Sequence, residues 1–118
     1  MKQSHVLQLA CEPLPIVRIG FIGLGNRGMA TLRRYLVIDG VEIVALCDIH
    51  RAHLDEASAV IAADGKYTPC LLNAQDGWKQ MCQRDDIDLI YICTDWLTHA
   101  PMACYAMEQG KHVAIEVP

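Results

Sequence analysis

The sequence predicts an α/β fold in which a parallel sheet of about five strands carries helices on both faces. Short apolar runs alternate along the chain with segments whose apolar residues recur at helical spacing. Two of the apolar runs are hydrophobic at nearly every position, which is typical of strands buried on both sides of a parallel sheet. Alternating strands and helices of this kind imply right-handed connections between parallel strands.

The first half of the chain contains two strand–helix pairs. Residues 17–22 are an apolar run that ends in glycines and predict the first strand, and a helix is expected over residues 26–38. Residues 41–47 predict a second, fully buried strand that Asp48 ends, and a helix follows over residues 51–63. The expected buried positions of the two helices are Met29, Leu32 and Leu36, and Leu54, Ala57 and Ile61.

The second half repeats the alternation with shorter elements. A short strand is expected over residues 66–70 and a helix over residues 74–83. A strongly apolar strand over residues 87–93, a helix over residues 98–109 and a last strand over residues 112–116 complete the pattern. The first of these helices is marked by Trp78, Met81 and Cys82, and the expected buried positions of the second are Ala100, Ala103, Cys104 and Met107.

The composition supports one packed domain and excludes several classes of function. Of the 118 residues, 53% are hydrophobic and 20% are charged, so the chain can form a core. The net charge is −4 and no run of Lys and Arg reaches four residues, which argues against nucleic-acid and membrane-surface partners. No run approaches the ~18 apolar residues of a membrane span. We therefore expect a cytoplasmic protein.

The six cysteines predict reduced thiols that pack as small hydrophobic side chains. No two of them have CxxC spacing, and neither Cys nor His residues are clustered, so no metal site is expected. The cysteines are Cys11, Cys47, Cys70, Cys82, Cys93 and Cys104.

A glycine motif, GxGxxG, follows the first predicted strand and opens the first predicted helix. In this context Gly23 permits a tight turn, Gly25 lets a pyrophosphate approach the backbone, and Gly28 lets helix and strand pack closely. The N–H groups at the start of the helix then face the phosphates. The motif predicts a Rossmann-like dinucleotide site formed by Gly23, Leu24, Gly25, Asn26, Arg27 and Gly28.

An acidic residue occupies the second position that such a site requires. Asp48 ends the second strand, twenty positions after Gly28. Its carboxylate can accept hydrogen bonds from the adenosine ribose and repels a 2′-phosphate, which favours NAD over NADP. Arg51 could instead pair with a 2′-phosphate. The alternative is that the glycines only form a turn and Asp48 caps the next helix.

The loop after the fourth predicted strand lies beside the switch point of a doubly wound sheet, where the nicotinamide half of a dinucleotide binds. It contains Trp96 and His99. From chemistry alone, His99 could equally bond a nearby carbonyl at the start of a helix, and Trp96 could pack over the loop.

Four stretches, residues 17–28, 45–48, 85–94 and 106–118, carry a family resemblance. Over residues 17–118 the chain resembles the N-terminal domain of the glucose–fructose oxidoreductase, inositol dehydrogenase and rhizopine-catabolism (Gfo/Idh/MocA) family. The resemblance implies binding of NAD or NADP and an activity on sugars, inositols or related polyols.

Two departures from the family motifs point to a branch. The family commonly has Thr-Pro-Asn followed three residues on by His; Thr94 and His99 match, whereas Asp95 and Trp96 do not. This variant resembles a branch that includes NAD-dependent glycosidases, which oxidise the sugar transiently. The resemblance implies that Thr94, Asp95, Trp96 and His99 line the cofactor.

The second departure lies at the end of the last strand. Members typically have Glu-Lys-Pro there, whose lysine polarises the reacting carbon, whereas this chain has Glu116-Val117-Pro118. Valine cannot donate a proton or a hydrogen bond from its side chain, which fits the glycosidase branch. Glu116 and Val117 are nevertheless expected near the cofactor, with Glu116 beside the nicotinamide ribose.

These observations predict a leader over residues 1–16, expected to be flexible, and a dinucleotide-binding domain over residues 17–118 that is truncated before a second, substrate-binding domain. The catalytic residues are expected in that absent domain. The leading prediction is the NAD(P)-binding domain of an oxidoreductase acting on a sugar or polyol, inactive alone. The alternatives are the cofactor domain of an NAD-dependent glycosidase and a non-catalytic nucleotide-binding module. Apolar surface exposed without the second domain makes a homo-oligomer conceivable.

Overall fold

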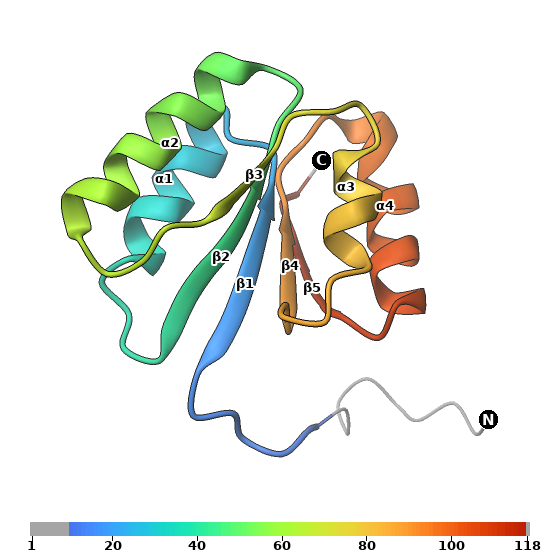
Figure 1. The fold of residues 1–118 in the computed structure, drawn as a ribbon. Helices are drawn as coiled ribbons and strands as arrows, with labels where there is room; N and C mark the ends of the chain where they lie inside the picture. Colours follow the sequence, from blue (N-terminus) through green and yellow to red (C-terminus); the bar gives the residue numbers. More distant parts are fainter. Residues whose placement is uncertain (1–9, 118) are drawn as a thin grey trace.

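The computed structural model describes residues 10–117 and has the predicted α/β architecture (Figure 1). Five parallel strands form one sheet in the order β3-β2-β1-β4-β5. The chain moves outward from β1 to β3, returns to the other side of β1, and moves outward again, so the connections diverge between β1 and β4. The strands are β1 (Val17–Ile22), β2 (Val41–Cys47), β3 (Cys70–Leu72), β4 (Leu89–Ile92) and β5 (His112–Ile115).

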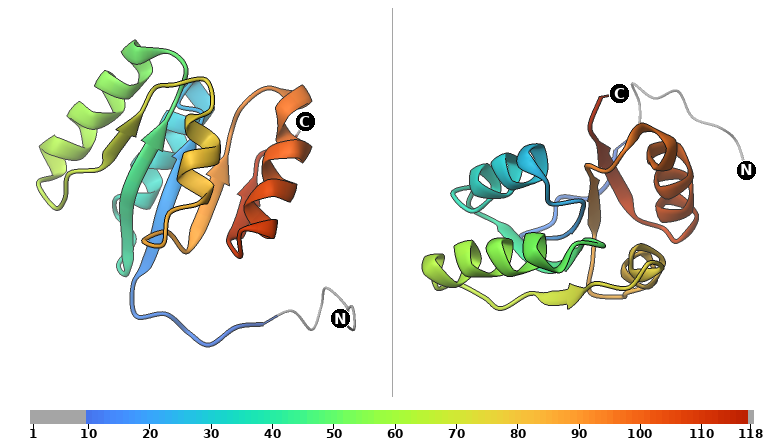
Figure 2. Two further views of the ribbon diagram at one scale, coloured as in Figure 1. Left: turned by 45° about the vertical axis from the view of Figure 1, so that its right-hand side comes forward. Right: turned by 90° about the horizontal axis from the view of Figure 1, so that it is seen from above.

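Two pairs of helices cover opposite faces of this sheet, as Figure 2 shows. The helices α1 (Asn26–Tyr35) and α2 (Arg51–Asp64) lie on one face, and α3 (Gly77–Cys82) and α4 (Trp96–Glu108) lie on the other. Both faces of the central strands are therefore buried, which accounts for their nearly continuous hydrophobic sequences.

Alternate residues of the strands supply two hydrophobic clusters, one under each pair of helices. From β1, Phe21 belongs to the cluster that contains Leu32 of α1 and Leu54 of α2. Its neighbour Ile22 belongs to the cluster that contains Met81 of α3 and Met102 of α4. The stripes predicted for α1 and α2 are buried, as are Met81 and Cys82 of α3, whereas Trp78 is half-buried.

Three predicted boundaries are wrong by several residues. The helix α1 ends at Tyr35 rather than at residue 38, because the chain turns toward Gly40, whose φ is +79°. The strand β3 begins at Cys70 rather than at residue 66, directly after Pro69, which has no N–H to donate to a neighbouring strand. The helix α3 begins at Gly77, three residues later than expected.

The helix α4 differs from its prediction in both its start and its buried face. It begins at Trp96 because the Asp95 side chain caps it, accepting a hydrogen bond from the Thr98 N–H at 3.1 Å. Its buried residues are His99, Met102, Ala103 and Ala106. Of the four positions predicted to be buried, only Ala103 is; Ala100, Cys104 and Met107 are exposed. The predicted stripe left out the polar His99, which is buried on the same side of the helix as Met102 and Ala106.

Candidate functional site

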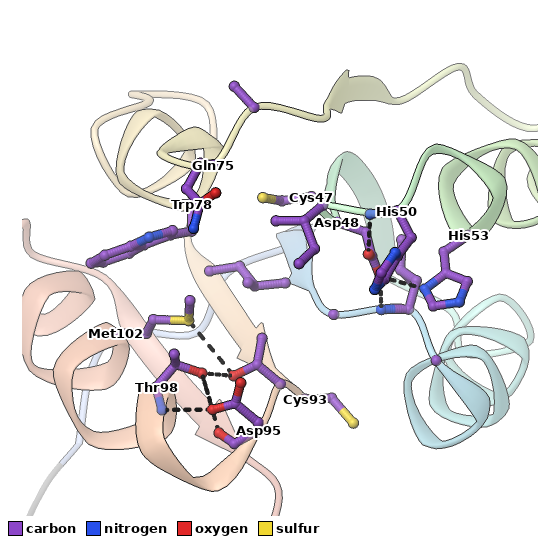
Figure 3. Close-up of a pocket in the computed structure, with 17 residues that line it drawn as sticks. Cys47, Asp48, His50, His53, Gln75, Trp78, Cys93, Asp95, Thr98 and Met102 are labelled. Atoms are coloured by element: carbon purple, nitrogen blue, oxygen red, sulfur yellow. Dashed lines mark hydrogen bonds and ion pairs between the residues drawn. The ribbon is translucent and has the colours of Figure 1, made fainter.

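A cavity of about 380 Å³ opens at the carboxyl edge of the sheet, where the ends of β1, β2 and β4 meet the starts of α3 and α4 (Figure 3). Ligands of open α/β sheets bind at this edge, near the point where the strand order diverges. The cavity is lined by Ile22, Gly23, Leu24, Gly25, Cys47, Asp48, Ile49, His50, His53, Ala74, Gln75, Trp78, Cys93, Thr94, Asp95, Thr98 and Met102.

The three motif glycines have different structural reasons to lack a side chain. Gly23 has a φ of +93°, and a Cβ there would lie 2.2 Å from the carbonyl oxygen of Cys93. A Cβ on Gly28 would lie 2.2 Å from the carbonyl oxygen of Gly23, so α1 presses directly on the loop. A Cβ on Gly25 would have nothing within 4 Å. Neither φ nor neighbouring protein atoms require glycine at Gly25, whereas a ligand lying against the backbone would.

The start of α1 has the features of an anion site. Its N-cap residue is Gly25, which provides no side-chain cap, and its first turn contains no acidic residue. The N–H groups of this turn are therefore available to an external acceptor, and the helix dipole favours a negative charge there. Asn26 and Arg27 are exposed and do not line the cavity.

Asp48 connects the end of β2 to the glycine loop and to α2. Its Oδ2 accepts hydrogen bonds from the Leu24 N–H at 2.8 Å and from the Nδ1 of His53 at 2.9 Å. Its Oδ1 accepts from the His50 N–H at 2.8 Å. The residue is 8% exposed, so these three contacts hold a nearly buried carboxylate.

The environment of Asp48 keeps it ionised. Burial acts to raise its pKa, but the hydrogen bonds from His50, Leu24 and His53 outweigh burial and hold the pKa below the ordinary carboxyl value. An ionised carboxylate has about four lone-pair positions, of which three are occupied here. One position on Oδ1 is therefore left for an external hydroxyl donor.

The opposite wall of the cavity is formed by the start of α4. Thr94 shares a hydrogen bond with Thr98 at 2.7 Å between their hydroxyl oxygens, and its hydroxyl also donates to the sulfur of Met102 at 3.7 Å. Asp95 lines the cavity as well, although its carboxylate is already the cap of α4. Figure 3 shows Trp78 and Met102 on this side, across from Asp48, His50 and His53.

Four predicted site residues of the second half do not line the cavity. Trp96 is 74% exposed and Val117 is 77% exposed. His99 is 7% exposed and faces the core; within the described residues its Nε2 has no hydrogen-bond partner. Glu116 accepts a hydrogen bond from the hydroxyl of Tyr91 at 3.1 Å.

Hydrogen bonds of the Tyr91 hydroxyl connect Glu116, which follows β5, with α1. The Tyr91 hydroxyl also lies 3.1 Å from the hydroxyl of Thr31, which makes a chain of three groups that ends at Glu116. Burial, together with the contact to Glu116, raises the pKa of Tyr91 to about 12. The tyrosine is therefore neutral and donates its proton to the Glu116 carboxylate.

Sequence reasoning did not identify several residues that form the cavity wall, among them His50, His53, Gln75 and Trp78. A positional signal was present, because each of these residues follows closely on a strand of the sheet, β2 or β3. Carboxyl ends of parallel strands meet at one edge, but which ends become neighbours depends on the strand order.

The described residues contain no group of three or more His, Cys, Asp or Glu side chains placed to hold a metal ion. All six cysteines are unpaired. Cys47 lines the cavity, and burial, with the neighbouring Asp48 charge, raises its pKa to about 12, so it is not a reactive thiolate. Within residues 10–117 no helix has the length and apolar character of a membrane span. The cytoplasmic location and the possible homo-oligomer remain predictions.

Comparison with known proteins identifies one family over nearly the whole chain. Its model, described as an oxidoreductase family with an NAD-binding Rossmann fold, matches residues 17–118. A protein of Bacteroides fragilis named alpha-N-acetylgalactosaminidase is 62% identical over 116 residues, which is 98% of this chain and 27% of that protein. A glycosyl hydrolase family 109 protein of Phocaeicola vulgatus is 48% identical over 118 residues, which is 100% of this chain and 29% of that protein.

Solved structures of inositol dehydrogenases have the same fold. Myo-inositol 2-dehydrogenase from Lactobacillus plantarum is 29% identical, with a TM-score of 0.75 over 87% of this chain and 28% of that one. Myo-inositol dehydrogenase from Lactobacillus casei, solved with NAD(H) and myo-inositol, has a TM-score of 0.76 at 24% identity, over 87% of this chain and 29% of that one. The chain thus spans less than a third of the length of these proteins.

Proposed function

The chain belongs to the oxidoreductase family with the NAD-binding Rossmann fold, whose model matches residues 17–118, and we propose that it is the cofactor-binding part of a longer enzyme that hydrolyses a glycoside. The observation that carries this proposal is its 62% identity, over 98% of its length, to a protein named alpha-N-acetylgalactosaminidase. The substrate proposed for the whole enzyme is accordingly a glycoside of an N-acetylated amino sugar.

The residues at the carboxyl edge of the sheet fit a dinucleotide. The backbone at Gly25 faces open space at the start of an uncapped helix, which suits a pyrophosphate. The remaining lone pair of Asp48 suits a ribose hydroxyl. We propose that residues 23–28, Asp48, Thr94 and Asp95 form the contacts, because all but three of them line one cavity. The exceptions are Asn26, Arg27 and Gly28, which open α1 beside it.

The preference proposed for NAD over NADP follows from the charges at the cavity. No Lys or Arg is among its lining residues, whereas the Asp48 carboxylate is. Arg51, the residue that could have paired with a 2′-phosphate, forms a salt bridge with Asp55 at 3.0 Å and does not line the cavity. A 2′-phosphate at Asp48 would thus meet a negative charge, and no Lys or Arg lines the cavity to compensate it.

Val117 also favours a glycosidase, because the lysine that the family typically has at this position to polarise the reacting carbon is absent. NAD, when bound, accepts a hydride from a sugar carbon and can return it, so a hydrolysis can proceed without net consumption of cofactor. The part of this chain is to bind and orient the dinucleotide. We propose that the substrate contacts and the acid–base groups belong to a further domain, since the relatives are more than three times as long as this chain.

A sugar or polyol dehydrogenase is the second candidate. It is favoured by the 29% identity and the TM-score of 0.75 with myo-inositol 2-dehydrogenase. The identity to the glycosidase-named relative is more than twice as high over a larger share of the chain.

Two measurements test the proposal. Calorimetric titration of the 118-residue chain with NAD and NADP is expected to show binding, with NAD bound more tightly. An enzyme that carries this domain, supplied with NAD and p-nitrophenyl α-N-acetylgalactosaminide, is expected to release p-nitrophenol without accumulating NADH. Accumulation of NADH with a polyol and no release of p-nitrophenol would favour the dehydrogenase instead.

A further inference from the structure

His53 supplies the only side-chain hydrogen bond to the Asp48 carboxylate among the described residues. Its Nδ1 lies 2.9 Å from Oδ2 of Asp48, and its side chain is 37% exposed against 7% for that of Asp48. The other two donors to this carboxylate, at Leu24 and His50, are backbone N–H groups. His53 is therefore the one donor to the Asp48 carboxylate that a change of side chain can remove.

The direction of this hydrogen bond follows from the charge of Asp48. An ionised carboxylate can only accept, so Nδ1 of His53 must carry the proton. Together with the Leu24 N–H, this donor occupies both lone-pair positions of Oδ2. The group that remains able to accept a further hydrogen bond is Oδ1, which has a single donor.

We propose that His53 is a positioning residue of the cofactor site: its Nδ1–H fixes the Asp48 carboxylate so that Oδ1 receives a ribose hydroxyl, and it thereby strengthens the selection of NAD over NADP. This inference rests on the proposed function, because it assigns Asp48 to the ribose. It adds a residue that lies in the first turn of α2 and is absent from the motif that identifies the site.

The charged groups around this contact are few. The ring of His50, the N-cap residue of α2, packs edge-on against that of His53 with 5.0 Å between centroids, and within α2 Arg51 is paired with Asp55. Further along α2, Glu56 lies 4.0 Å from Arg33 of α1. The Cys47 thiol on β2 is protonated, and Asp95 lines the cavity on the α4 side. None of these side chains makes a described hydrogen bond to the Asp48 carboxylate. A change in the pKa of Asp48 when His53 is replaced can therefore be attributed to the loss of the His53 hydrogen bond.

The test compares two substitutions of His53 with a matched control in the 118-residue chain. His53→Ala removes the donor, and alanine is a good helix former at this half-buried position of α2. His53→Asn keeps an N–H donor close to the place of Nδ1. His112→Ala removes an exposed histidine at the start of β5, outside the cavity. For each chain, carbon NMR gives the pKa of the Asp48 carboxyl, and calorimetry gives the affinities for NAD and NADP.

The expected result is that His53→Ala raises the pKa of Asp48 and weakens NAD binding roughly 5- to 10-fold, as for loss of one ordinary hydrogen bond. It should also bring the ratio of the NAD affinity to the NADP affinity closer to one. His53→Asn should largely restore all three quantities, and His112→Ala should match the parent. An unchanged Asp48 pKa and affinity ratio in His53→Ala would overturn the inference. If the folded parent chain binds no NAD, the proposed function is wrong for this chain, while the titration still decides whether His53 holds Asp48.

Discussion

Replacing Gly28 with alanine tests how closely α1 packs on the strand before it. The added Cβ would lie 2.2 Å from the carbonyl oxygen of Gly23 and 3.0 Å from its carbonyl carbon, and both are backbone atoms that cannot rotate away. Relieving this overlap requires the start of α1 to move by more than 1 Å, since ordinary contacts of a Cβ begin near 3.4 Å.

The magnitude follows from two opposing effects. Overpacking in a filled interior costs about 1–3 kcal/mol, and a backbone clash belongs at the upper end of that range. Alanine within a helix recovers up to about 1 kcal/mol relative to glycine. Gly28→Ala should therefore lower the free energy of unfolding by about 2 kcal/mol and the Tm by roughly 8 °C for a domain of this size.

Urea unfolding followed by circular dichroism measures this loss, and Gly25→Ala is the matched control. Gly25 has φ −71° and ψ −164°, a conformation that alanine adopts freely, and its Cβ would meet nothing within 4 Å. The control should unfold at the same urea concentration as the parent or slightly above it. A Gly28→Ala chain within about 0.5 kcal/mol of the parent would refute the packing argument.

Three further substitutions have distinct expected outcomes. Gly25→Val should leave the urea midpoint unchanged but abolish NAD binding in calorimetry, because the side chain fills the space assigned to the pyrophosphate; retained binding would mean that the cofactor lies elsewhere. Asp48 has a lowered pKa, so its stabilising contribution is present above about pH 3.8 and is lost as the pH falls through its folded-state pKa. Asp48→Asn should flatten the acid limb of the stability profile, and an identical limb would contradict this. Tyr91→Phe keeps the ring but loses the hydrogen bonds to Thr31 and Glu116, which should cost about 1 kcal/mol in urea unfolding. The pKa of Tyr91 is raised to about 12, so its contribution is present below pH 10 and is lost toward pH 12, and the Phe variant should lack that alkaline loss.

The sheet and the glycine loop could be predicted because their signals are local. A buried parallel strand is hydrophobic at almost every position, and the boundaries of β1 and β2 were predicted correctly from that pattern. The GxGxxG spacing predicted a tight turn at Gly23 and a close helix–strand contact at Gly28, and a Cβ at either residue would lie 2.2 Å from a backbone carbonyl oxygen. Asp48 was placed by its distance from the loop, and it does lie against Leu24.

The buried face of α4 and the far wall of the cavity could not be predicted in the same way. Hydrophobicity alone leaves His99 out of the buried face of α4, yet this residue is 7% exposed. Which side of the helix faces the sheet is determined by the packing of the folded structure. Trp78 contributes to the cavity because α3 is brought beside α4 by the strand order. In the sequence Trp78 only helped to mark a helix, and its spacing does not distinguish a core residue from a half-buried aromatic residue that borders a cavity.

The hydrogen bond from the Leu24 N–H to Asp48 has a thermodynamic consequence for ligand binding. Together with the bond from the Gly23 N–H to the Cys47 carbonyl at 2.9 Å, it fixes the glycine loop at two successive residues to the end of β2. Ordering a free loop costs about 1–2 kcal/mol of conformational entropy for each residue. A loop that is already fixed avoids much of this cost, so more of the interaction energy with a bound dinucleotide remains as affinity. The ordering of this loop is thus completed during folding rather than at the moment of binding.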